Sequence, residues 1–186
     1  MQVKNLVGMW LETGGQMSFD SEYLLEDFVL RYREQLRTVR LVEPIADIST
    51  LVSCWNIRSV DMNGNADVYS IRALGDCRSL QSLSTSQCGE VKDIAALATL
   101  PALHTLDVSG NRYLQPLSSC TTIVKLDISD SVSLTDISPL RFLQNLRELD
   151  LTYCLELSDF SPLAACTALQ SLNINRTATS ALSNPV

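Results

Sequence analysis

Basic residues are too scarce in this sequence for a protein that binds nucleic acids through their phosphates. Among 186 residues there are 14 Lys and Arg against 21 Asp and Glu, which gives a formal net charge of −7. A phosphate-binding surface needs a clustered excess of Lys and Arg. Direct nucleic-acid binding is therefore not expected.

Long apolar runs are also missing. The run LVGMWL at residues 6–11 is interrupted by Glu12. It is too short for the apolar core of a secretory signal and far too short to cross a bilayer. We expect no membrane anchoring and an intracellular protein, cytoplasmic by default, with a nuclear or organellar location left open.

What the sequence does contain is one hydrophobic spacing that recurs six times. The clearest copy is LRELDLTYC, in which Leu146, Leu149, Leu151 and Cys154 occupy the pattern LxxLxLxxC. The first positions of the six copies are residues 57, 80, 103, 123, 146 and 169, so the spacings are 23, 23, 20, 23 and 23 residues. This period is that of leucine-rich repeats and differs from the periods of helical repeats.

Each copy predicts one coil of a solenoid. The LxL segment is a short strand whose leucines point into the core, while the residues between them face outward. The strands stack in parallel. Return segments such as LTDISPL at 134–140 and LSDFSPL at 157–163 predict a capped 3₁₀ or helical turn. The third repeat is three residues shorter before Pro116, which predicts a tighter coil there.

The amino-terminal region differs from the repeats. Residues 1–17 are interpreted as an extended lead-in, and a helix is expected from Asp20, with Asp20 or Ser18 as its N-cap. This helix would cap the first coil, which would otherwise expose apolar side chains. The predicted organisation is a lead-in and capping helix (1–35), a solenoid of about six to seven coils (36–179) and a tail (180–186). The helix prediction uses the spacing of Tyr23, Leu24, Phe28, Tyr32 and Leu36.

At these repeats the chain resembles the leucine-rich-repeat family. Its DISPL-type return segments and LDLS-like strands are similar to the internalin and phosphatase-regulator branch, and Cys beside LTDISPL resembles repeats common in kinetoplastid parasite proteins. One extra residue before the next Leu departs from the usual spacing of that branch. The resemblance implies an α/β solenoid, a right-handed curved coil with short parallel strands on its concave face, and a protein-binding role.

The six cysteines all have places in the repeat, and none forms a CxxC pair. We therefore expect buried, reduced thiols rather than a metal site or disulfides, and no cofactor. Four of them share the position three residues before the next strand repeat, and two alternate with Asn, Ser and Thr at the turn after the strand. That second set is predicted to hold backbone groups of the turn and comprises Asn65, Cys88, Asn111, Ser131, Cys154 and Thr177.

Candidate binding residues lie on the concave face. An outward column contains four carboxylates, which either attract a basic partner or hold neighbouring backbone, and both readings stay open. Tyr and Arg, which dominate interface energetics, are expected to converge in the last two repeats. The predicted partner-binding residues are Asp107, Asp127, Asp150, Arg147, Tyr153, Asn173 and Arg176.

The predicted function is that of a non-enzymatic interaction scaffold or assembly subunit, with a regulatory subunit that holds an enzyme such as a protein phosphatase as the alternative. The single histidine, His104, lies on an open strand surface and has no pocket or oxyanion hole for a triad. Trp55 is expected to point outward on the convex side, covered by the amino-terminal segment or by a partner. The last coil has no predicted cap, so a partner or a second copy is expected to cover it.

Overall fold

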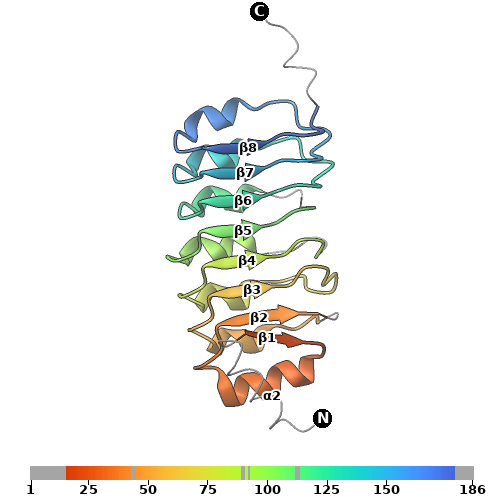
Figure 1. The fold of residues 1–186 in the computed structure, drawn as a ribbon, viewed down its shortest axis with the longest axis vertical. Coiled ribbons are helices and arrows are strands. Elements are labelled where there is room, and N and C mark those ends of the chain that lie inside the picture. Colours follow the sequence, from red (N-terminus) through yellow and green to blue (C-terminus); the bar gives the residue numbers. More distant parts are fainter. Residues whose placement is uncertain (1–15, 43–44, 89–90, 92, 112–113, 179–186) are drawn as a thin grey trace, which may run out of the picture.

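The computed structural model describes residues 16–42, 45–88, 91, 93–111 and 114–178. Its strands form one parallel eight-stranded sheet in which sequence neighbours are also spatial neighbours (Figure 1). This order confirms the predicted parallel stack. The strands are β1 (Gln16–Phe19), β2 (Thr38–Leu41), β3 (Ser59–Asp61), β4 (Ser82–Ser84), β5 (Thr105–Asp107), β6 (Lys125–Asp127), β7 (Glu148–Asp150) and β8 (Ser171–Asn173).

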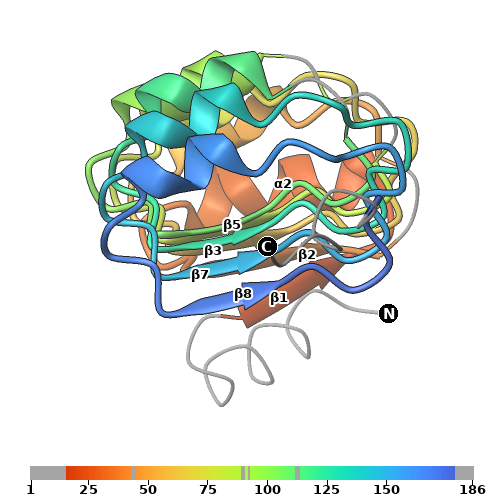
Figure 2. The same cartoon turned by 90° about the horizontal axis from the view of Figure 1, so that it is seen from above.

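A row of 3₁₀ helices forms the wall opposite the sheet (Figure 2). Aspartates precede several of these helices, as predicted: Asp136 Oδ1 accepts the Ser138 amide at 2.7 Å, which keeps the pKa of that carboxyl below its ordinary value. The helices are η1 (Ser49–Ser53), η2 (Arg72–Asp76), η3 (Ile94–Thr99), η4 (Gln115–Ser119), η5 (Ser138–Phe142) and η6 (Ser161–Ala165).

Between the two walls lies a continuous apolar core. The central leucine of the inner strands is buried, as at Leu126 and Leu149, which are 1% and 3% exposed, whereas Leu172 of the last strand is 42% exposed. The shorter third repeat does not disturb the sheet, because β5 pairs with β6 in the same register as the other strands. Its contraction falls between Asn111 and Leu114, on the return side.

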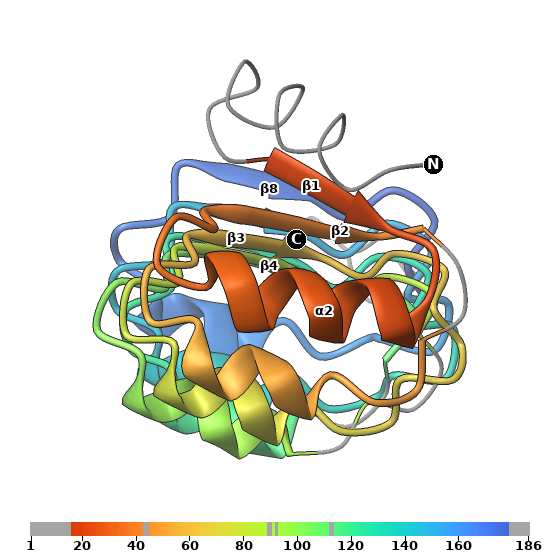
Figure 3. The same cartoon turned by 90° about the horizontal axis from the view of Figure 1, so that it is seen from below.

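The predicted capping helix is α2 (Glu22–Tyr32), which lies across the end of the core between the sheet and the 3₁₀ helices (Figure 3). The predicted N-cap was wrong: the Ser21 side chain accepts the Leu24 amide at 3.3 Å. The spacing that predicted the helix is buried only in part, at Phe28 and Leu36. Leu25, Phe28 and Val29 are buried, whereas Tyr23 is 75% exposed, because the i, i+3, i+4 set that faces the core starts at Leu25.

The first strand, β1, was not predicted. It pairs in parallel with β2, and Phe19 at its end packs edge-on against Phe28 of α2 at 5.5 Å between ring centroids. The rest of the predicted lead-in, residues 1–15, and the predicted tail, residues 180–186, lie outside the described residues. In the part of the chain that the structure describes, no helix is long and apolar enough to cross a membrane.

Candidate functional site: the sheet face and its two edges

The turn after each strand is held by the polar column that the sequence predicted to be structural. Asn65 shows the full arrangement: its Oδ1 accepts the Ile45 amide at 3.0 Å, and its Nδ2 donates to the carbonyls of Leu41 and Met62 at 2.8 and 3.2 Å. Cys88 Sγ donates to the Met62 carbonyl. These side chains are buried and occupied, so the column is structural.

Burial also makes the thiols poor nucleophiles. All six cysteines are free and buried. Desolvation raises the pKa of Cys77 to about 12 and the pKa of Cys88, Cys120 and Cys154 to about 11. Because the thiolate is the reactive form, these positions are unsuited to covalent chemistry.

Burial of the cysteines should affect both their labelling and the stability of the chain at high pH. Iodoacetamide at about pH 8 should leave the thiols of the folded protein unmodified and should label all six in urea, as intact mass would record. The folded pKa of Cys77 lies above its ordinary value of 9.0, so the protonated thiol favours folding. This contribution is complete below pH 9 and is lost as the pH rises toward 12. Rapid labelling of the native chain would contradict the burial of these groups.

The acidic column on the sheet face caps the turns that follow the strands. Asp127 Oδ1 accepts the Ser129 amide at 2.9 Å, and Asp150 Oδ1 accepts the Thr152 amide at 2.8 Å. Asn173 makes the same kind of bond with its amide oxygen. One oxygen of each side chain therefore has a local structural role, and this role does not require a charge, because asparagine also performs it.

The second carboxylate oxygens differ along this column. Asp107 Oδ2 accepts the Ser84 hydroxyl at 2.8 Å, and Asp150 Oδ2 accepts the Asn173 amide at 3.1 Å. Among the described residues, no hydrogen bond to Asp127 Oδ2 is formed. The aspartates of this column can therefore cap the turns and also attract a basic partner, since each role uses a different carboxylate oxygen.

A hollow of about 260 Å³ lies over this part of the sheet, and its lining includes Asp127, Asp150 and Asn173. Lys125 and Glu148, which also line it, form an ion pair at 3.0 Å. A larger hollow of about 530 Å³ lies elsewhere, against η1 and η2, where Tyr69 and Arg72 border it. That hollow contains no predicted site residue, whereas the smaller one gathers three.

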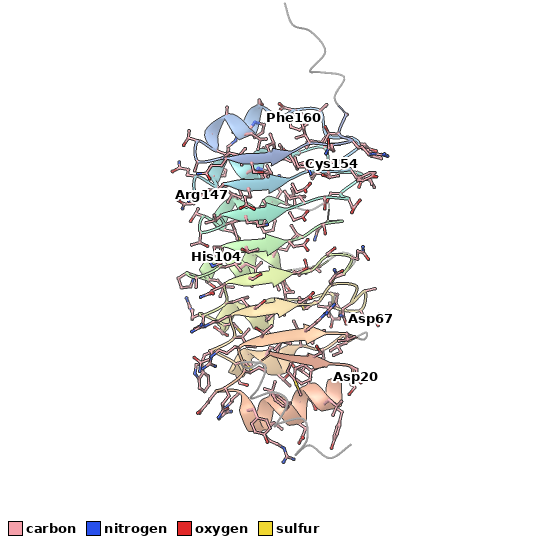
Figure 4. All side chains as sticks on the ribbon, viewed as in Figure 1. Asp20, Asp67, His104, Arg147, Cys154 and Phe160 are labelled. Carbon is pink, nitrogen blue, oxygen red and sulfur yellow. The ribbon has the colours of Figure 1, made fainter. Side chains whose placement is uncertain are left out.

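The predicted cluster of Arg147, Tyr153 and Arg176 is divided by the structure. Arg147 immediately precedes β7, at what we call the strand-start edge of the sheet, where Figure 4 also shows His104. Tyr153 and Arg176 lie in turns beyond the other ends of β7 and β8, at the strand-end edge. They do contact each other: the Arg176 guanidinium lies 5.0 Å from the centroid of the Tyr153 ring.

The strand-end turns also impose an unusual backbone. Tyr153 and Arg176 have φ angles of 61° and 57°, in the left-handed region, where Gly64 and Gly110 stand in other coils. A residue with a Cβ in that region costs roughly 1–2 kcal/mol relative to glycine. Gln87 and Asp130 adopt the same conformation at this position of their coils, so the left-handed turn belongs to the repeat, and Tyr153 and Arg176 differ from them in size and in their contact with each other.

An apolar patch beside this pair was not predicted. Val132 and Leu155, each 51% exposed, occupy the position after the buried Ser131 and Cys154 in successive coils. The sequence signal that could have predicted this patch is the presence of two branched apolar residues at the same outward position of successive repeats. Together with Tyr153 and Arg176, they make the strand-end edge beside β6–β8 the surface richest in interface-type residues within the predicted site.

His104 has no catalytic surroundings in the described structure. Its side chain is exposed, and Nδ1 lies 3.2 Å from Thr105 Oγ1, its neighbour in sequence. Trp55 is 46% exposed, and the Arg33 guanidinium lies 5.8 Å from its ring centroid. The amino-terminal helix region therefore contacts Trp55 without enclosing it.

Comparison with solved structures agrees with this geometry. The crystal structures of internalin C2 and of an internalin F from Listeria monocytogenes each align with a TM-score of 0.64 and 26% sequence identity. The fold is a leucine-rich-repeat solenoid. The alignments cover 75% and 77% of this chain but only 62% and 42% of the two internalins, so the solenoid corresponds to part of each.

Sequence comparisons add nothing to the solenoid assignment, because no protein-family model and no curated protein matches the chain. The internalin part of the predicted resemblance is supported by the solved structures. The resemblance to phosphatase regulators and to kinetoplastid repeats stays a prediction.

Proposed function

We propose that this chain is a non-enzymatic scaffold that binds a protein through the sheet face and the strand-end edge of β6–β8. The observation that carries the proposal is the continuity of two features there. The polar hollow lined by Asp127 and Asp150 lies over strands β6–β8, and the turns that follow β7 and β8 carry the stacked Tyr153 and Arg176 in a left-handed backbone conformation.

The chemistry of this surface suits a partner segment with both basic and apolar groups. Asp127 offers a carboxylate oxygen that makes no hydrogen bond with the residues the structure describes, and a Lys or Arg side chain could enter the hollow and bind it. Tyr153 and the exposed Leu155 offer apolar area next to it. Aromatic and arginine side chains surrounded by polar groups are typical of the centres of protein interfaces.

The design of a test follows from the two roles of each aspartate. Replacing Asp127 and Asp150 together by asparagine removes two charges but keeps the oxygen that caps the turn, as Asn173 does naturally. Tyr153→Gly removes the ring and relieves the left-handed backbone. Gln87→Gly makes the same backbone change three coils away, where φ is 56°, and serves as the control.

The prediction is that partner recovery falls about tenfold or more in affinity purification with the Asp127→Asn/Asp150→Asn and Tyr153→Gly chains. Quantitative mass spectrometry would compare them with wild type and Gln87→Gly, which should retain equal amounts. Equal partner recovery by all four chains would contradict the proposal that this surface binds the partner. A stoichiometric set of structural proteins would support the scaffold, whereas a retained protein phosphatase would favour the regulatory-subunit alternative.

A further inference from the structure

Four arginines gather at the strand-start edge of the first coils. Arg37 and Arg58 occupy the position before β2 and β3, and their backbones are joined by a 2.7 Å bond from the Arg58 amide to the Arg37 carbonyl. Arg33 follows α2, and Arg78 repeats the position of Trp55 in the next coil. Adjacent coils are about 5 Å apart, so the four side chains belong to one region of the surface.

The local structure leaves these guanidinium groups without acidic partners. Among the described residues, none of the four has a carboxylate within 4 Å, although Arg31, Arg40 and Lys125 all form ion pairs. The acidic side chains nearest in sequence are exposed Glu34 and Asp76, together with Asp61, whose charge is paired with Arg40. The cluster therefore keeps an excess of two positive charges in a chain whose net charge is −7.

Three of the four arginines are nevertheless positioned by neutral contacts. Arg37 Nη1 donates to the carbonyls of Glu34 and Leu36 at 2.8 and 3.2 Å, and Arg78 Nη1 donates to the Thr99 carbonyl at 3.0 Å. Arg33 lies over the Trp55 ring. Each guanidinium has five N–H donors, so these contacts orient the groups while leaving donors available.

We propose that Trp55 and these arginines form a second docking surface, which binds a short acidic segment of a partner protein. Guanidinium groups bind carboxylates through paired hydrogen bonds, and the half-exposed Trp55 ring can receive an apolar side chain of the same segment. This surface lies at the opposite edge from Tyr153 and Arg176, and its charge is opposite to that of the sheet-face carboxylates. It is independent of the proposed function.

The occupant is a peptide rather than a nucleic acid because the basic region is short. Coils one to three span roughly 15 Å, which corresponds to about five extended residues. A longer polyanion would continue along the same edge to Gln81 and Val124, which precede β4 and β6 and carry no charge. These side chains do not extend a phosphate-binding surface, which needs clustered Lys and Arg.

The test is fluorescence anisotropy with three labelled probes and the full chain. The probes are a peptide of about ten residues with Asp and Glu around a central Leu-Phe pair, its counterpart with Asn and Gln in place of the acids, and an oligouridine of similar length. The variants are Trp55→Ala and Arg58→Gln/Arg78→Gln. Arg72→Gln/Arg141→Gln changes the net charge equally at exposed positions of η2 and η5 and is the control. Circular dichroism checks the fold of each chain.

We expect the acidic peptide to bind about tenfold more tightly than the other two probes, and binding to weaken about tenfold in Arg58→Gln/Arg78→Gln but not in the control. Trp55→Ala should weaken it as well, even at high salt, since the ring contact is not screened. Equal binding of the neutral peptide, equal loss in both arginine pairs, or tighter binding of the oligouridine would each overturn the proposal.

Discussion

Replacing Asn65 by alanine should lower the free energy of unfolding by about 3 kcal/mol. The side chain is 1% exposed and bonds the backbone of Ile45, Leu41 and Met62. Alanine would remove the bonds that the Ile45 amide and the Leu41 carbonyl make to the side chain, whereas the Met62 carbonyl keeps the Cys88 thiol as a donor. Each buried group left without a partner costs roughly 1–3 kcal/mol. Urea unfolding followed by circular dichroism would measure the change.

Two further variants make this prediction specific. Asn63→Ala alters an exposed side chain two residues away and should change the free energy of unfolding by less than about 0.5 kcal/mol. Asn65→Cys should recover part of the loss, because Cys88 donates to the Met62 carbonyl from the corresponding position of the next coil. If Asn65→Ala were as mild as Asn63→Ala, the polar column would not support the turns.

Leu149→Ala should destabilise the chain by about 3 kcal/mol, whereas Leu172→Ala should cost less than about 1 kcal/mol. The two leucines are register partners on β7 and β8, but Leu149 is 3% exposed and Leu172 is 42% exposed. The first substitution leaves a cavity between two coils. The second removes a side chain that already borders solvent.

This matched pair also tests the predicted covering of the terminal coil. Unfolding measured at several protein concentrations would show whether Leu172 stabilises the single chain or an assembly. If a second copy covers this end, Leu172→Ala should shift the equilibrium in sedimentation velocity toward the monomer. A monomeric wild-type chain at micromolar concentration would contradict the second-copy version of that prediction.

The repeat made most of the fold predictable. An apolar residue that recurs every 20 or 23 residues determines where a strand must lie, and the strands β3–β8 follow the LxL segments. The strand β1 escaped prediction because QMSF is a single short segment with no repeat around it. The start of α2 was misplaced because Ser18, Asp20 and Ser21 are all good N-caps, and only packing against the core selects among them.

The candidate site was less predictable, for a geometric reason. Arg147 and Tyr153 belong to the same repeat, and their repeat positions place them on the same exposed side. Strand β7 nevertheless lies between them and places them at opposite edges of the sheet, so they cannot form one cluster. The contact between Tyr153 and Arg176 depends on left-handed turns. Such turns are hard to predict from a sequence that has no glycine at the turn position.

The short third repeat has a consequence for how such a chain can change. Three residues are missing between Asn111 and Leu114, yet Asp107 still pairs with Asp127 as Asp127 does with Asp150. Length can thus vary on the return side while the spacing of the sheet-face side chains is preserved, whereas one residue inserted into a strand would reverse its faces. Insertions and deletions after the turn column can therefore accumulate without altering what the sheet presents to a partner.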